Sequence, residues 1–502
     1  SPISGSMRFR SWRGFATLGF GPPPLLHAIS AQARKKITEF SQQGIANLAW
    51  SCATLGFNDL PLLQALSSAA IPQISQFLPR SVANMTWACA PLCYEDRPLW
   101  KSISAASIPT ISQFGEADVS NIAWSFATIG LEDWPLMAAL SAAASMKMPE
   151  FGLQGLANTA WACASLAYGD QPLRHAIAAA ALPKIACRGD GGPALGFEEV
   201  HSILSVVSAF SEEEHVQLEL QAPLLSAAEE SLREHSRLLD GGGLVPSTMD
   251  SAAGREETIS RPRVLAEQRH ALALAKPPGW TVTVGFDGQD GAAASPGPGQ
   301  GATGGRLQDW VAENLGPLLP VARDVGAQHG LVHRLDRDTS GVVLAAKTYL
   351  GLHLAQLRFV TRRVRKEYTC LCHGCFPEAR RYLEAPLRQV PAGGAVGGLE
   401  AALRPVAAVD PGGRSARTEV VSVAHLHCPA GGALSLARLR LHTGRRHQIR
   451  AHLAAEGAPL AADPAYGGRP AAWCRRTFLH ACLLRVDAGD GPWEVACPLP
   501  PD

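Results

Sequence analysis

The segment with the clearest capacity for chemistry is HGLVHRLDRDTSGVVLAAK, residues 329–347, where a polar group of residues precedes an apolar run. Its central acid, Asp336, lies between Arg334 and Arg337. Neighbouring positive charge favours the carboxylate, so the sequence predicts that Asp336 stays ionised. An ionised carboxylate is the form that attacks an electrophilic carbon or removes a proton. Taken alone, the pattern fits a salt-bridged surface loop equally well.

Two other patterns raise the alternative of metal or thiol chemistry. Residues 370–375 read CLCHGC, which contains a CxxC pair of the kind found in zinc and redox sites. No second pair of ligands lies nearby in the sequence, which argues against zinc. His329 and His333 could also bind a metal beside Asp336. We interpret neither pattern as a metal site.

Four further blocks accompany the Asp336 segment. Taken together they resemble RluA-type pseudouridine synthases, in the order and approximate spacing of that family, over nearly all of residues 265–502. The blocks are HRLDRDTSG at 333–341, KPPG at 276–279, RKEY at 365–368, LRLHTGRRHQIRAHLAAEGAPLAADPAYGG at 439–468 and LHA at 479–481.

The resemblance implies a catalytic set of three residues. Asp336 would attack the sugar or remove a sugar proton, so that the N1 glycosidic bond of a uridine breaks and the uracil rejoins through C5. Arg450 would pair with this carboxylate through a bidentate bond. Tyr368 would pack on the uracil and help to remove the C5 proton, although a core aromatic on a strand is the alternative. The reaction involves no redox change, so no cofactor and no metal are expected.

The resemblance also implies a substrate-binding set. A base inside an RNA stem must be extruded before it can react, and Arg334 would fill the gap that it leaves. Ile449 would line the uracil pocket. The full set expected to bind substrate is Arg334, His333, Ile449, Arg445 and Lys276. The arginines at 438, 440, 445 and 446 would follow phosphates, although each fits a solvated face equally well.

The elements around these blocks indicate an α+β domain with a mixed or antiparallel sheet. Short β-like runs occur with helical patches between them, without regular alternation: Ala271–Ala275, Gly341–Ala345, Glu367–Cys372, Thr418–Val423, Ala437–Leu441 and Phe478–Val486. Residues 265–502 would form this catalytic domain. Low-complexity sequence predicts an interdomain linker at 236–264 and flexible insertions at 288–305 and 392–413.

The first half of the chain is a repeat. Trp50, Trp87, Trp124 and Trp161 are spaced 37 residues apart, and Asn47, Asn84, Asn121 and Asn158 keep the same spacing. A period of this length predicts a solenoid of helical hairpins over residues 1–235. The pattern resembles octotricopeptide-type repeats of organellar RNA-binding proteins. Because stacking demands constant spacing, we expect the Trp and Asn side chains to lie in the core.

Charge and cysteine content narrow the partners and the compartment. The net charge is +1, but residues 331–370 carry eight Lys or Arg against three acids, whereas residues 41–190 carry seven basic and ten acidic residues. An RNA partner (tRNA, rRNA or mRNA) is therefore expected at the C-terminal half, and an RNA or protein partner at the repeats. The twelve cysteines lack the dense spacing of a secreted scaffold, so an intracellular reducing compartment is predicted, with chloroplast or mitochondrion among the candidates. No membrane partner is expected.

Two other functions are consistent with the same sequence. The chain could be an RNA-binding scaffold whose synthase-like domain only docks RNA, or a protein-binding solenoid fused to an unrelated enzyme. Base isomerisation separates the first from a synthase, and RNA binding by residues 1–235 tests the second.

Overall fold

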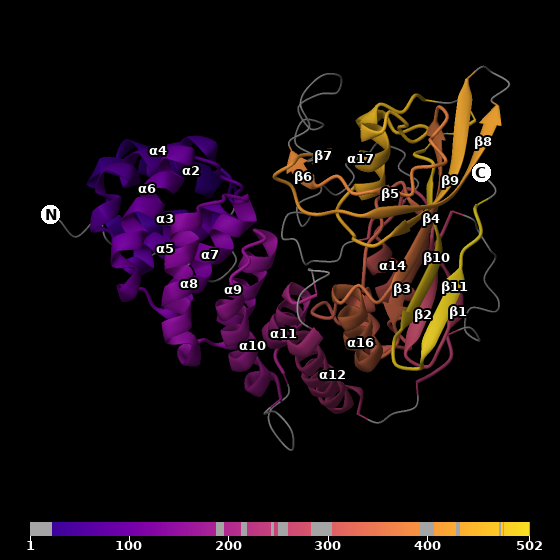
Figure 1. The fold of residues 1–502 in the computed structure, drawn as a ribbon, viewed down its shortest axis with the longest axis horizontal. Coiled ribbons are helices and arrows are strands. Elements are labelled where there is room, and N and C mark those ends of the chain that lie inside the picture. Colours follow the sequence, from indigo (N-terminus) through magenta and orange to yellow (C-terminus); the bar gives the residue numbers. More distant parts are fainter. Residues whose placement is uncertain are drawn as a thin grey trace. The chain divides into compact units, whose positions relative to one another are not determined.

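The structure is a computed structural model in which the chain forms two compact units, Ser1–Ala228 and Glu229–Asp502 (Figure 1). It describes residues 23–186, 195–211, 218–241, 245–248, 260–282, 304–390, 406–427, 432–470, 473–474 and 476–500. Over these residues, no helix is both long enough and apolar enough to cross a membrane.

The described part of the first unit is built from helices, as predicted. The α-helices are α2 (Pro23–Lys35), α3 (Gln42–Thr54), α4 (Leu60–Ala70), α5 (Pro79–Cys89), α6 (Arg97–Ser107), α7 (Glu116–Ile129), α8 (Trp134–Lys147), α9 (Leu153–Ser165), α10 (Gln171–Ala186), α11 (Phe197–Ala209) and α12 (Leu218–Asp240). Short 3-10 turns separate successive hairpins: η1 (Ile37–Glu39), η2 (Ile71–Gln76), η3 (Ile108–Gln113) and η4 (Met148–Glu150).

The same acid begins the second helix of each hairpin. Asp59, Asp96, Asp133 and Asp170 each accept a hydrogen bond from the backbone N–H three residues later, which satisfies a donor that the first helical turn leaves unpaired. A proline follows in the first turn, where its missing N–H costs nothing. This local chemistry explains why the hairpins recur with one register.

The Trp and Asn positions of the repeat differ from the prediction. The repeated Phe114 and Phe151 are fully buried, but all four Trp and all four Asn side chains are partly exposed. The expectation that they lie in the core is therefore wrong. The constant spacing arises because the first helices pack side by side, which aligns one exposed stripe as readily as one buried stripe.

The second unit contains a nine-stranded sheet in the order β1-β2-β3-β10-β4-β9-β8-β5, with β11 paired to β10. Its strands are β1 (Arg263–Glu267), β2 (Ala271–Lys276), β3 (Ser340–Ala346), β4 (Arg365–His373), β5 (Tyr382–Leu383), β8 (Thr418–His427), β9 (Ala433–Leu441), β10 (Leu479–Asp487) and β11 (Pro492–Ala496). β3 and β10 are parallel and the other pairs are antiparallel. This confirms the predicted α+β class with a mixed sheet.

Helices complete the core of this unit. They are α14 (Leu307–Asn314), α15 (Pro320–Arg323), α16 (Tyr349–Val360) and α17 (Gln448–Ala455), with short turns η5 (Gln328–Gly330) and η6 (Pro464–Tyr466). All seven residues of β3 are buried. Where β3 meets β10, Gly341 has a φ of 127°, and a Cβ there would lie 2.3 Å from the carbonyl oxygen of Ala481. Only glycine fits this close approach of two backbones.

The boundary between the units lies earlier than the predicted linker. From Glu229 onward, α12 belongs to the second unit. Ser236 hydrogen-bonds His353 of α16, and the Asp240 carboxylate accepts from the backbone N–H groups that begin α16. The residues at 236–240 are therefore helical and packed, because an amphipathic helix stabilises itself by burying its apolar face.

The two predicted insertions lie partly outside the described residues, at 288–303 and 392–405. The remainder of the second insertion is ordered. β7 (Val406–Val409) pairs with β6 (Leu387–Val390) in a separate two-stranded sheet. The sequence prediction missed β7 because this strand is only four residues long and lies in a Gly-rich segment.

Glu267 ties the described part of the predicted linker to the sheet. Its carboxylate accepts hydrogen bonds from Ser247, Thr248 and Lys347. Burial alone would raise the pKa of Glu267, but these donors outweigh it and lower the pKa from 4.5 to about 2. The stabilisation is therefore present above the ordinary pKa and is lost as the pH falls from 4.5 towards 2.

We expect Glu267→Gln to lower the free energy of unfolding by about 2 kcal/mol at neutral pH. The difference from the wild type should shrink as the pH falls below 4.5. Urea unfolding of the full chain across this pH range measures both effects. Glu384→Gln removes an exposed carboxylate and should change stability by less than about 1 kcal/mol at any of these pH values. An equal effect of the two substitutions would contradict the role of Glu267.

Candidate active site

Asp336 lies in a loop between η5 and β3 that neighbouring backbone groups hold in place. The Thr339 N–H donates to the Asp336 carbonyl oxygen over 3.1 Å. The Gly279 N–H and the Lys276 Nζ both donate to the carbonyl oxygen of Arg337, over 2.9 and 3.0 Å. The side chain of Asp336 remains 25% exposed. The loop is therefore fixed while its carboxylate stays accessible.

Lys276 has a different place from the one predicted. Its side chain is buried, and its Nζ donates to the carbonyl oxygens of Pro277 and Arg337. Burial lowers the pKa of Lys276 to about 7, against the opposing effect of Asp338 and Asp336. The amine of Lys276 thus donates to a backbone oxygen of the loop that carries Asp336. Lys276 therefore positions Asp336 instead of contacting a substrate.

Arg450, on α17, faces Asp336 but binds another acid more closely. Its Nε and Nη2 donate to the two carboxylate oxygens of Asp463 over 2.8 and 2.7 Å. The distance from its Nη1 to Oδ2 of Asp336 is 3.7 Å. The bidentate partner of Arg450 is thus Asp463, which corrects the expected pairing. Burial opposes the charge of Arg450, but the Asp463 bonds outweigh it and raise the pKa of the guanidinium.

His447 is a second neighbour of Asp336 that sequence reasoning missed. It precedes α17 in the left-handed region, with a φ of 52°, and its Nε2 lies 3.9 Å from Oδ1 of Asp336. The Tyr466 hydroxyl accepts from the Ala407 N–H and contacts His447 Nδ1 over 3.0 Å. Since that hydroxyl can then donate to Nδ1, the ring proton is left on Nε2, facing Asp336. Burial lowers the pKa of His447, with Asp336 opposing, so the ring is neutral at neutral pH.

Tyr368 lies on β4, opposite Ala481 of β10 and Leu439 of β9. It is buried. Burial and then the negative charge of Asp336 raise the pKa of its hydroxyl well above the ordinary value. The phenol therefore stays protonated at neutral pH, within the electrostatic range of Asp336.

Comparison with known proteins assigns the segment that carries this site. Residues 271–455 match the family model described as RNA pseudouridylate synthase. An uncharacterized RNA pseudouridine synthase of Chloroflexus aurantiacus is 38% identical over 176 residues, which are 34% of this chain and 51% of the relative. Ribosomal large subunit pseudouridine synthase C of Vibrio vulnificus is 29% identical over 262 residues, 51% of this chain and 71% of the relative. Within the second unit, residues 271–455 are therefore similar to RNA pseudouridine synthases, and we call this unit the synthase domain.

A solved structure is also similar to this synthase domain. Human RNA Pseudouridylate Synthase Domain Containing 1 has 24% sequence identity and a TM-score of 0.34, over 49% of this chain and 86% of that one. The chain spans about half the length of the Chloroflexus relative.

The other predicted residues of the synthase domain divide into two groups. Arg334 is exposed beside Asp336, and Ile449 is buried next to Arg450 on α17. His333 is engaged within the domain: its Nε2 accepts from the Leu344 N–H, and its ring stacks on Phe359. Burial lowers the pKa of His333 to about 3, so the imidazole is neutral at neutral pH.

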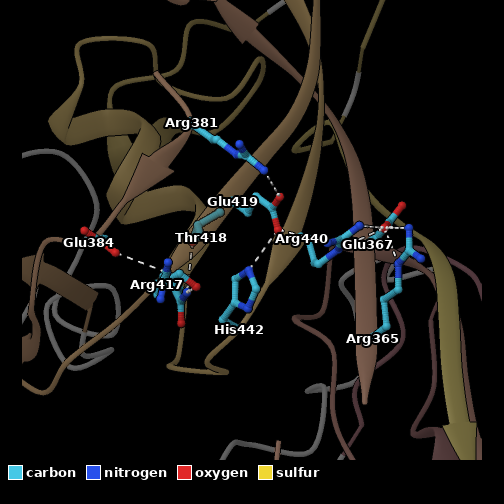
Figure 2. Close-up of polar contacts among 10 residues, drawn as sticks. Arg365, Glu367, Arg381, Glu384, Arg417, Thr418, Glu419, Arg440 and His442 are labelled. Carbon is cyan, nitrogen blue, oxygen red and sulfur yellow. Dashed lines mark hydrogen bonds and ion pairs between the residues drawn. The ribbon is translucent and has the colours of Figure 1, made fainter. Parts of the chain in front are cut away.

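Several of the predicted phosphate-binding arginines are held by acids of the sheet, as Figure 2 shows in part. Arg438 and Arg440 of β9 both donate to Glu367 of β4, which is fully buried at the side chain. Arg440 also donates to Glu419. Arg445 donates through Nε to the Ser415 carbonyl oxygen. These contacts fix the guanidinium groups on the sheet and reduce their freedom to follow a phosphate chain.

Sequence reasoning missed three residues of the synthase site: His447, Asp463 and Tyr466. All lie within the block 439–468 that signalled the family. Asp463 sits in the text DPAY, which is typical of an ordinary turn. Its fully buried side chain and its place opposite Arg450 become visible only in three dimensions.

Proposed function

We propose that this protein isomerises uridine to pseudouridine in RNA. The observation that supports the proposal most is the accessible carboxylate of Asp336, faced by Arg450 at 3.7 Å and by His447 at 3.9 Å. Asp336 either attacks C1′, so that an ester bond forms as the bond between C1′ and N1 breaks, or removes a sugar proton, so that the sugar is released from N1. The uracil turns and C5 bonds to C1′, while the ester bond breaks or the sugar proton returns to the sugar. C5 then loses its proton and N1 gains one, so Asp336 is regenerated and no group enters or departs.

Arg450 and His447 have complementary roles in this proposal. The guanidinium places a positive charge 3.7 Å from one carboxylate oxygen of Asp336. The neutral imidazole lies 3.9 Å from the other oxygen. A carboxylate that is flanked by these two side chains reaches the reacting sugar in a fixed geometry.

Tyr368 is proposed to assist the loss of the C5 proton. Its raised pKa keeps the hydroxyl protonated, so the hydroxyl acts by relaying a proton to a neighbouring base and not as a phenolate. Tyr368→Phe keeps the ring and removes only the hydroxyl. We expect it to slow pseudouridine formation by about 10²-fold with little change in RNA affinity. An unchanged rate would show that the residue only packs against the base.

RNA is the proposed substrate, and the target base must leave its stack to reach Asp336. Arg334 is exposed in the same loop and is proposed to occupy the vacated space. Whether the target lies in tRNA, rRNA or mRNA is left to mapping. The twelve cysteines lack the dense spacing of a secreted scaffold, which supports a reducing compartment, with chloroplast or mitochondrion among the candidates.

Transcriptome-wide pseudouridine mapping, before and after removal of the protein, tests the proposal. Sites that disappear and return only with the active protein would name the target. RNA association without any lost site would instead support a docking role for the synthase domain.

A further inference from the structure

A groove runs across the first helices of the helical hairpins, within the first unit. Figure 1 shows α3, α5, α7, α9 and α11 side by side. The cavity along them has a volume of about 800 Å³. We call it the array groove and define it by the lining residues Trp50, Asn84, Trp87, Asn121, Asn158 and Glu198.

Few side chains are exposed in the central segments of these helices. Within residues 81–90, 118–127 and 155–163, every side chain is buried except one Asn and one Trp in each segment. The Asn precedes the Trp by three residues, so both lie on one helix face. A stripe that only filled the space between helices would be buried throughout. Here Asn84, Trp87, Asn121 and Asn158 of the stripe line the groove.

The amides in this stripe are available to a ligand. In the described part of the chain, the side chains of Asn84, Asn121 and Asn158 make no hydrogen bond to another residue. Each amide offers both an acceptor and donors. A row of such groups at one per repeat matches a ligand that also presents alternating donors and acceptors, as an extended polypeptide backbone does.

The spacing of the Trp rings fits the same ligand. The centroids of Trp50 and Trp87, the two rings that line the groove, lie 6.4 Å apart. An extended chain advances about 3.3 Å per residue, so about two residues separate these rings. Two alternate side chains of the ligand would therefore meet the two rings.

Charge favours basic side chains at those positions. Three glutamates and one lysine line the groove, and Glu198 is exposed on α11. Residues 41–190 carry seven basic and ten acidic residues. This field attracts ammonium and guanidinium groups, which also bind favourably over Trp faces. It opposes a phosphate backbone, which requires basic contacts.

We propose that the array groove binds an extended polypeptide segment rich in Lys or Arg, with the Asn amides on its backbone and the rings of Trp50 and Trp87 against two of its alternate side chains. The partner is thus a basic, unstructured protein segment. This site is separate from the synthase site, so the failure of one assignment leaves the other standing.

Fluorescence anisotropy with the full chain tests this proposal. The probe is a fluorescein-labelled peptide of alternating lysine and serine, about 10 residues long, which corresponds to roughly 33 Å when extended. The triple variant Asn84→Ala/Asn121→Ala/Asn158→Ala should bind it at least about tenfold more weakly, because each lost hydrogen bond contributes a few-fold. The control variant Gln64→Ala/Ser68→Ala changes exposed polar residues of α4 and should bind like the wild type.

Glu198→Lys supplies a second measurement at an exposed residue that leaves the stripe intact. It should weaken binding of the lysine peptide and have no effect on a serine-only peptide. Circular dichroism shows whether each variant is folded. Absence of peptide binding by the wild type, or equal binding by the triple variant, overturns the proposal. So does a loss of oligouridylate binding in the triple variant without a loss of peptide binding, since this would identify the groove as an RNA site.

Discussion

Asp336→Ala is expected to abolish pseudouridine formation, with a loss of more than about 10⁴-fold in rate, because no other group can replace the reacting carboxylate. Asp336→Asn should lose as much, since it keeps the size of the side chain and removes the charge. Single-turnover assays on an RNA identified by mapping measure the rate, and filter binding measures RNA affinity. Affinity should change by less than about threefold, because phosphate contacts dominate it.

Asp338→Asn is the matched control for this loss. Asp338 is an exposed acid in the same loop, two residues from Asp336. Its substitution removes the same charge from the same region, so the general field on the RNA changes equally. We expect it to retain activity within about threefold of the wild type. Equal losses in the two variants would mean that loop charge matters and that Asp336 has no special role.

The sequence predicted the centre of the synthase sheet well and its edges poorly. The runs Ala271–Ala275 and Gly341–Ala345 correspond to β2 and β3 within one residue at each end. These central strands are continuous apolar runs, because both of their faces are covered. β1 begins at the end of the predicted linker, and β7, which lies in the separate two-stranded sheet, falls in a predicted insertion. The two strands are only five and four residues long, and such short apolar runs are recognised as strands only together with their pairing partners.

The contacts of the predicted catalytic residues differ from those that the sequence led us to expect. The structure brings Asp336, Arg450 and Tyr368 into one region, but it gives the two best hydrogen bonds of Arg450 to Asp463. A motif identifies residue types along the chain and carries no information about which acid an arginine prefers. His333 shows the same limit, since it neighbours Arg334 in the motif while its ring stacks on Phe359 of α16.

The helical array shows a complementary limit. The period of the repeat located each Trp and each Asn along the chain. The same period is compatible with a buried row and with an exposed row of side chains, so it does not predict their burial. Burial decides between them, and the neighbours of each helix set it. The first helices pack on both sides, so the remaining stripe on their outer face had to be the exposed one.

Asp463 is expected to be the strongest determinant of the geometry around Arg450. Its side chain is fully buried and its carboxylate binds Nε and Nη2 of Arg450. Asp463→Asn leaves a buried guanidinium without its compensating charge. We expect a loss of about 3–5 kcal/mol in the free energy of unfolding, measured by urea denaturation. The double variant Asp463→Asn/Arg450→Gln should recover part of this loss, because it removes the orphaned charge as well.

Activity separates a positioning role of Asp463 from a purely structural one. Without Asp463, the Arg450 fork is free to turn towards Asp336, whose carboxylate now faces Nη1 at 3.7 Å. A displacement of about 1 Å at the reacting carboxylate costs about 10²-fold in rate. We therefore expect kcat to fall by about this factor at temperatures where the variant is fully folded, while KM for RNA stays nearly constant. A folded variant with normal kcat would show that Asp463 stabilises the domain without orienting its site.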